Sequence, residues 1–124
     1  MKTILIVEDN EKNMKLVRDV LQAKGYATLE AVTGEDGVRL AAEHRPALVL
    51  MDIQLPGISG IEALKRLRAV PATASIPVIA VTASVMASDR RNITDAGFDG
   101  YVGKPLNLRE FLDAVAGAIG PAGA

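Results

Sequence analysis

Residues 48–57 read LVLMDIQLPG, in which four apolar residues run directly into Asp52 before a Pro-Gly turn. A short, continuous apolar run predicts a parallel strand that is covered by helices on both faces. In an open sheet of such strands, ligands bind beyond the carboxyl ends of the strands. We therefore interpret the carboxylate of Asp52 as part of a binding site at that edge of the sheet.

Short apolar runs of this kind alternate with helical patterns five times along the chain. The runs span residues 4–7, 26–31, 48–51, 78–81 and 98–102. The helical patterns begin after residues that commonly cap helices, namely Asn10, Thr33, Ser59, Ser88 and Asn107. With right-handed crossovers, this alternation predicts an α/β fold, a doubly wound (βα)5 sandwich. We expect its five-stranded parallel sheet to have the strand order 2-1-3-4-5.

The length and composition restrict the kind of protein. A chain of 124 residues suits one domain, which we expect over residues 1–119, followed by a short disordered tail at 120–124 with the sequence GPAGA. The net charge of -1 argues against nucleic-acid binding, and the absence of cysteine excludes disulfides and thiolate metal sites. No stretch approaches the roughly 20 apolar residues that span a bilayer, so we expect a cytoplasmic protein with no membrane insertion.

Polar side chains are expected to gather where four of the predicted strands end. Glu8 and Asp9 follow the first strand, Asp52 and Thr82 follow the third and fourth, and Lys104 follows the fifth. Taken one at a time, each has an ordinary structural explanation as a helix-terminal acid, a cap or a turn residue. Their convergence at one edge of one sheet favours a functional site.

The charges of this group predict a bound divalent cation. Two carboxylates about 5 Å apart repel by roughly 3 kcal/mol at an effective dielectric constant of about 20. Three carboxylates and one lysine leave an excess of negative charge that one divalent ion would cancel. Oxygen ligands alone favour Mg2+, with Mn2+ as an alternative, whereas a zinc site would want several histidines or cysteines.

Residues 3–119 resemble the response-regulator receiver domain, the CheY-like family. The matching stretches are ILIVEDN at 4–10, LVLMDIQLPGISGIE at 48–62, IPVIAVTA at 76–83 and GYVGKP at 100–105. The resemblance implies a flavodoxin-like fold and a protein that signals through a phosphorylated aspartate. Within the family, VEDNEKNMKL at 7–16 and MDIQLPGISG at 51–60 resemble single-domain regulators of the bacterial cell cycle.

The resemblance implies roles for the acidic residues. Asp52 would accept a phosphoryl group from a phosphohistidine. Asp9, Asp52 and the backbone carbonyl of Gln54 would bind Mg2+ directly, and Glu8 would act on the metal through water. Glu8 stands where many members of the family have aspartate, which is one methylene shorter.

Four further residues are implied to respond to the phosphoryl group. Lys104 would pair with Asp52 and afterwards with the phosphoryl oxygens. The hydroxyl of Thr82 and the backbone N–H of Ala83 would bind that group and draw the following loop inward. Tyr101 would change rotamer with the loop.

The resemblance also implies partner proteins. The phosphodonor would be a sensor histidine kinase or a histidine phosphotransfer protein, which in the family meets the first helix and the loop after the fifth strand. The candidate docking residues are Asn13, Met14, Leu16, Pro105 and Leu106. Because Met14 and Leu16 lie at opposite flanks of the apolar stripe of the first helix, both docking and plain core packing fit them.

The chain shows no output domain after residue 119, which predicts a stand-alone regulator acting on a downstream protein target. We expect a monomer or a weak phosphorylation-dependent dimer, and no enzymatic activity beyond self-phosphorylation and slow self-dephosphorylation. One alternative is a small Mg2+-dependent phosphohydrolase, which would want a cap domain or a second acid where Gln54 stands. The other is a receiver-like adaptor that is never phosphorylated, which would not need the complete set of acids with Thr82 and Lys104.

Overall fold

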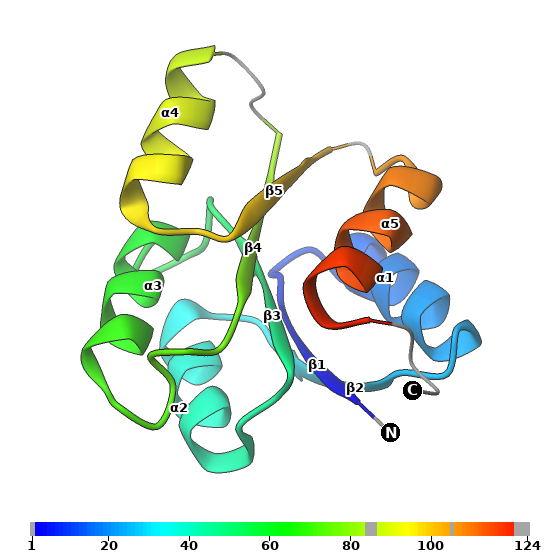
Figure 1. Ribbon diagram of the computed structural model, residues 1–124, viewed down its shortest axis with the longest axis horizontal. Helices are drawn as coiled ribbons and strands as arrows, with labels where there is room; N and C mark the ends of the chain where they lie inside the picture. Colours follow the sequence, from blue (N-terminus) through cyan, green and yellow to red (C-terminus); the bar gives the residue numbers. More distant parts are fainter. Residues whose placement is uncertain (1, 84–86, 105, 121–124) are drawn as a thin grey trace.

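A parallel sheet lies between two layers of helices (Figure 1). The computed structural model describes residues 2–83, 87–104 and 106–120. The strands are β1 (Thr3–Val7), β2 (Ala27–Ala31), β3 (Leu48–Asp52), β4 (Val78–Thr82) and β5 (Gly100–Gly103). All pairings are parallel and follow the order β2-β1-β3-β4-β5, which confirms the predicted fold and strand order.

The helices that follow the strands divide between the two faces of the sheet. They are α1 (Glu11–Ala23), α2 (Gly34–His44), α3 (Gly60–Ala69), α4 (Ala87–Ala96) and α5 (Leu108–Ile119). Helices α1 and α5 cover one face, and α2, α3 and α4 cover the other (Figure 1). Across the residues that the structure describes, no helix combines the length and the apolar character needed to cross a membrane.

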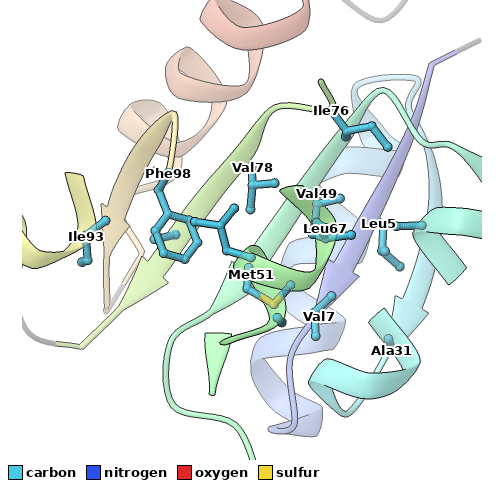
Figure 2. Packing of buried hydrophobic residues seen from close by; sticks show 14 residues of the cluster. Leu5, Val7, Ala31, Val49, Met51, Leu67, Ile76, Val78, Ile93 and Phe98 are labelled. Atoms are coloured by element: carbon cyan, nitrogen blue, oxygen red, sulfur yellow. The ribbon is translucent and has the colours of Figure 1, made fainter. Parts of the chain in front are cut away.

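The central strands are buried on both faces, which explains their continuous apolar runs. In β1, Leu5 and Val7 pack with residues of α2 and α3, whereas Ile4 and Ile6 pack with residues of α1 and α5. Figure 2 shows the first of these two clusters, in which side chains from neighbouring strands meet the covering helices. Because successive side chains of a strand point to opposite faces, both odd and even positions must be apolar here.

The predicted caps begin four of the five helices. The side chains of Asn10, Thr33, Ser59 and Asn107 each accept a hydrogen bond from the backbone N–H three residues further on. The prediction for Ser88 is wrong, because α4 begins at Ala87. A residue inside a helix has helical backbone angles and cannot take the extended conformation of a cap.

The last strand begins later than its apolar run predicts. Phe98 belongs to that run, but it lies before β5 and is buried in the cluster under α3 and α4. The next residue, Asp99, ends the turn: its N–H donates to the carbonyl of Val78 (2.8 Å), and its carboxylate accepts from the N–H of Val78 (2.8 Å). Arg68 holds the same carboxylate at 2.9 Å, so a side-chain network decides where the strand starts.

The end of α5 is tied to the opposite edge of the sheet. Gly120 caps the end of α5, and its N–H donates a hydrogen bond to the carbonyl of Ala116. The hydroxyl of Tyr26 donates to the carbonyl of Gly120 at 2.9 Å. The rest of the predicted tail, residues 121–124, lies outside the described residues.

Candidate functional site

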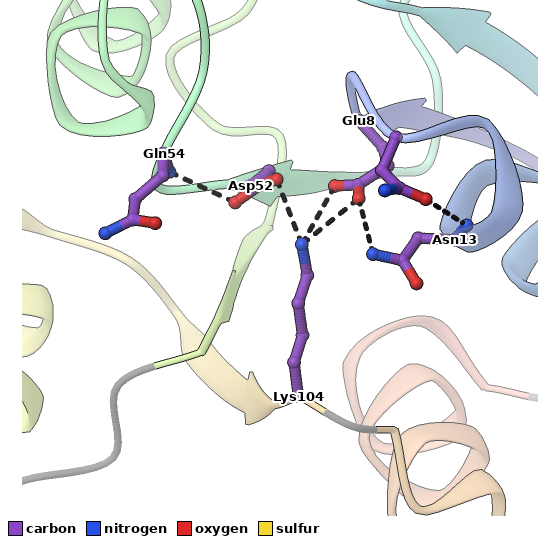
Figure 3. Close-up of polar contacts among 6 residues, drawn as sticks. Glu8, Asn13, Asp52, Gln54 and Lys104 are labelled. Carbon is purple, nitrogen blue, oxygen red and sulfur yellow. Dashed lines mark hydrogen bonds and ion pairs between the residues drawn. The ribbon is translucent and has the colours of Figure 1, made fainter.

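The carboxyl ends of β1, β3 and β5 bring the predicted charged residues together (Figure 3). Glu8, Asp9 and Asp52 each offer a carboxylate oxygen, and these three oxygens lie within 4.8 Å of one another. The ammonium of Lys104 reaches into the same group from the segment that follows β5. The convergence predicted from the strand order is therefore present in the structure.

Asp52 is the last residue of β3, and its side chain is held at both oxygens. The residue is only 5% exposed. Its Oδ1 accepts the backbone N–H of Gln54 at 3.0 Å, and its Oδ2 accepts the Nζ of Lys104 at 3.0 Å. These two bonds fix the orientation of a carboxylate at the edge of the sheet.

Glu8 is equally buried and has more hydrogen-bond partners than the sequence predicted. It is 4% exposed, and Lys104 Nζ donates to its Oε1 and Oε2 at 3.1 and 3.2 Å. The side-chain amide of Asn13 donates to Oε1 at 3.0 Å. The sequence indicated Asn13 as a docking residue, and its one sign of this contact with Glu8 was an amide at the start of the helix that follows the acid.

Burial and the neighbouring charged groups alter the pKa values of Glu8 and Lys104. Burial raises the pKa of Glu8 to about 7, and the neighbouring Asp52 adds to the rise, whereas hydrogen bonds from Asn13 and Lys104 oppose it. Burial lowers the pKa of Lys104, but its hydrogen bonds to Asp52 and Glu8 outweigh that effect and leave the pKa raised. Lys104 therefore stays positively charged at neutral pH. The three clustered acids carry more negative charge than this one lysine can balance.

The ligand set of this group fits a hard divalent cation. The three clustered acids offer oxygen atoms only, of which Asp9 is exposed while Glu8 and Asp52 are buried. Mg2+ prefers such ligands and keeps several waters, which the exposed side of Asp9 allows. That the backbone carbonyl of Gln54 binds the metal stays a prediction.

The predicted switch residues lie next to the acids along the same edge. Thr82 ends β4 and is buried, and its carbonyl accepts the backbone N–H of Lys104 at 2.8 Å, which joins the ends of β4 and β5. Ala83 and Tyr101 are exposed. Their roles toward a phosphoryl group stay predictions.

The predicted docking residues separate into exposed and buried ones. Leu16 is 40% exposed, whereas Met14 is only 6% exposed and packs in the core under α1. Met14 also lines a cavity of about 400 Å³ beside Glu8 and Asp9, so its role toward a partner stays a prediction. Leu106 is partly buried, and it lines a cavity of about 170 Å³ together with Leu16 and Asn13. Pro105 lies outside the described residues.

Comparison with known proteins identifies the family. The model of the response regulator receiver domain matches residues 4–116. The chain is 46% identical over 121 residues to the polar-differentiation response regulator DivK of Brucella anthropi, covering 98% of both chains. DivK of Brucella ovis is 45% identical over the same share of each chain. These relatives confirm the resemblance that the sequence stretches indicated.

Solved structures agree with this relationship. The receiver domain of a sensor histidine kinase from Pseudomonas aeruginosa, which holds a magnesium ion in its active-site cleft, is 34% identical with a TM-score of 0.89, over 96% of this chain and 98% of that one. The chemotaxis protein CheY4 of Vibrio cholerae has the same fold, with a TM-score of 0.89 at 23% identity over 95% of this chain and 98% of that one. The chain belongs to the response regulator receiver domain family.

Proposed function

We propose that this receiver protein accepts a phosphoryl group on Asp52 and signals through contacts that depend on it. The observation that carries the proposal is the buried Asp52 carboxylate, which is held between the N–H of Gln54 and the ammonium of Lys104 beside two further acids. The donor would be the phosphohistidine of a sensor histidine kinase or of a histidine phosphotransfer protein.

The transfer needs little covalent chemistry from the protein. A carboxylate oxygen of Asp52 forms a bond to phosphorus while the bond between phosphorus and the donor imidazole nitrogen breaks, which leaves an acyl phosphate. The N–H of Gln54 and the Nζ of Lys104 orient the carboxylate before the reaction. Afterwards Lys104 is close enough to pair with the oxygens that arrive.

Asp9 and Asp52 would hold the divalent ion, with Glu8 acting through water and the Gln54 carbonyl as a further ligand. When bound, Mg2+ offsets negative charge on the transferred oxygens, and Mn2+ would do the same. Asp9 is the most accessible of the three acids, which gives the ion a route into the cluster.

We propose that the protein works as a stand-alone regulator of cell polarity or the cell cycle. The support is its likeness to DivK, which is named for polar differentiation and which the chain matches over 98% of its length. Its output would be a downstream protein target, reached as a monomer or a weak phosphorylation-dependent dimer.

The test of the proposed function is phosphoryl uptake from acetyl phosphate, followed by intact-protein mass spectrometry. With Mg2+ we expect a mass gain of one phosphoryl group, and with excess chelator we expect none. No gain with Mg2+, or an equal gain in chelator, would contradict the proposal.

Thr82 is expected to matter for the response more than for acceptance of phosphate. The Thr82→Ala variant should still take up a phosphoryl group, because Asp52 and Lys104 remain in place. It should lose most of the phosphorylation-dependent chemical-shift change at Tyr101, since the hydroxyl that would contact the phosphoryl oxygens is gone. Wild-type shift changes at Tyr101 in this variant would show that Thr82 does not couple the two positions.

Leu16 is expected to contribute to docking of the phosphodonor. It is an exposed apolar side chain on the rim of the cavity that also contacts Lys104 and Leu106. Leu16→Ala should slow transfer from a cognate histidine phosphotransfer protein about tenfold, while uptake from acetyl phosphate is unchanged. Val70→Ala is the matched control, since Val70 is 42% exposed but lies at the end of α3. Equal slowing in both variants, or loss of both activities in Leu16→Ala, would exclude a docking role.

A further inference from the structure

The first turn of α1 is built so that Asn13 faces the acidic cluster. Asn10 caps the helix, and its Oδ1 accepts the backbone N–H of Asn13 at 3.0 Å. In many helices the side chain of this third residue turns back to the backbone of the cap. Here the amide of Asn13 reaches past the cap and donates to Oε1 of Glu8 at 3.0 Å instead (Figure 3).

The Glu8 carboxylate that Asn13 contacts also binds Lys104. Both oxygens of Glu8 accept from Lys104 Nζ, at 3.1 and 3.2 Å, and the same Nζ donates to Oδ2 of Asp52 at 3.0 Å. The Asn13 amide, the Glu8 carboxylate, the Lys104 ammonium and the Asp52 carboxylate thus form one chain of contacts. Figure 3 shows Lys104 lying between the two carboxylates, and the Asn13 amide beside it donates to the same oxygen of Glu8.

The burial of Glu8 makes its orientation depend on these contacts. Glu8 is 4% exposed, so water gives its carboxylate little support and its orientation depends on protein donors. The backbone of Glu8 is also held, since its N–H donates to the carbonyl of Ala31 at 3.0 Å. With the main chain fixed by β2 and one carboxylate oxygen fixed by Asn13, Lys104 meets a carboxylate of defined position.

We propose that Asn13 is a positioning residue for phosphoryl transfer: it holds Glu8, and through Glu8 it places the Lys104 ammonium against Asp52. The inference rests on the proposed role of Asp52 as the phosphoacceptor. Among the hydrogen bonds of the described residues, the Asn13 side chain donates to Glu8 and not to Asp52, so it would act through Glu8. When a residue that hydrogen-bonds and orients a functional group is replaced, activity commonly falls by roughly 10- to 100-fold.

The first experiment removes the amide and keeps the branched shape of the side chain. In Asn13→Leu, we expect the rate of phosphoryl uptake from acetyl phosphate at saturating Mg2+ to fall roughly tenfold. In the metal-free protein, the 15N resonance of the Lys104 ammonium should shift and broaden, because Glu8 no longer holds it in one place. Lys12→Leu on the exposed side of the same turn is the matched control and should change neither reading.

The second experiment exchanges side-chain length between the two partners. Glu8→Asp shortens the acid by one methylene, and Asn13→Gln lengthens the amide by one, so each single variant breaks the contact. The double variant rebuilds it, and the flexible stem of Lys104 can follow the carboxylate. We expect the double variant to take up phosphate at least threefold faster than either single variant, whereas uptake no faster than in the single variants would overturn the proposal.

The rate of phosphoryl uptake and the 15N resonance of Lys104 together separate this inference from the proposed function. If wild-type protein takes up no phosphoryl group, the proposed function fails, and the Lys104 resonance still decides whether Asn13 positions the ammonium. If uptake is normal in the wild type and both the rate and the resonance are unchanged in Asn13→Leu, Asn13 is only a structural partner of Glu8. Urea unfolding of every variant confirms that the compared proteins are folded.

Discussion

The Asp52→Asn variant is expected to incorporate no phosphoryl group from acetyl phosphate or from a histidine phosphotransfer protein, even at saturating Mg2+. An amide is not a nucleophile toward phosphorus, so the loss should be complete rather than partial. The amide also removes one of the three clustered acids and weakens the metal site. Intact-protein mass spectrometry and transfer of radiolabelled phosphate both measure the outcome.

The fold should survive this substitution. Glu8, Asp9 and Asp52 place three carboxylate oxygens within 4.8 Å of one another, and a neutral amide at position 52 relieves the repulsion among these like charges. We therefore expect the free energy of unfolding of Asp52→Asn to be no lower than that of the wild type. Asp19→Asn, an exposed acid on α1, is the control and should be phosphorylated normally. Phosphoryl uptake that survives in Asp52→Asn and in Asp52→Ala would place the acceptor elsewhere.

The Gly60→Ala variant is expected to lose at least about 3 kcal/mol of unfolding free energy, because the added methyl has no room. A Cβ at position 60 would lie 2.2 Å from the backbone oxygen of Asp52 and 2.9 Å from the Cα of Ile53. The N–H of Gly60 donates to the carbonyl of Ile53 at 3.0 Å, so the start of α3 is pressed against the end of β3. Relief of the clash would move the backbone that carries the acceptor, and phosphoryl uptake should slow as well.

Gly117→Ala provides the matched control for the loss at Gly60. Gly117 lies in α5, and a Cβ there would meet nothing within 4 Å. Since alanine favours a helix over glycine, this variant should gain about 0.5–1 kcal/mol in unfolding free energy. Urea denaturation measures both variants, and a loss at Gly60 no larger than about 1 kcal/mol would show that the close approach of α3 to β3 relaxes easily.

Much of the fold could be predicted from the sequence because it rests on local chemistry. Apolar runs buried on both faces, four of the caps and the alternation of strands and helices are each decided within a few residues. The acids and Lys104 follow strand ends, so the strand order alone brings them to one edge. The convergence of the acids and Lys104 at this edge therefore followed from the strand order before any contact was known.

Two predictions of where elements begin failed, at the start of α4 and at the start of β5. Ser88 lies inside α4 rather than at its cap, since the helix begins one residue earlier. Phe98 packs in the core ahead of β5, because Arg68 and Val78 hold Asp99 in a turn. The apolar stripe of α1 is wide, and packing on the sheet decides that Met14 is buried while Leu16 stays exposed.

The groups that meet at the carboxyl edge follow from the strand order and from the residues at the strand ends: Glu8, Asp9, Asp52, Thr82 and Lys104. How these groups pair follows from the packing of the sheet and its helices, with Lys104 shared between two carboxylates and Asn13 supporting Glu8. Strand order places residues to within several ångströms, whereas a hydrogen bond requires donor and acceptor within about 3 Å. That last step depends on side-chain length and on the angle at which α1 leaves β1, and both take effect only when the sheet and its helices are packed together.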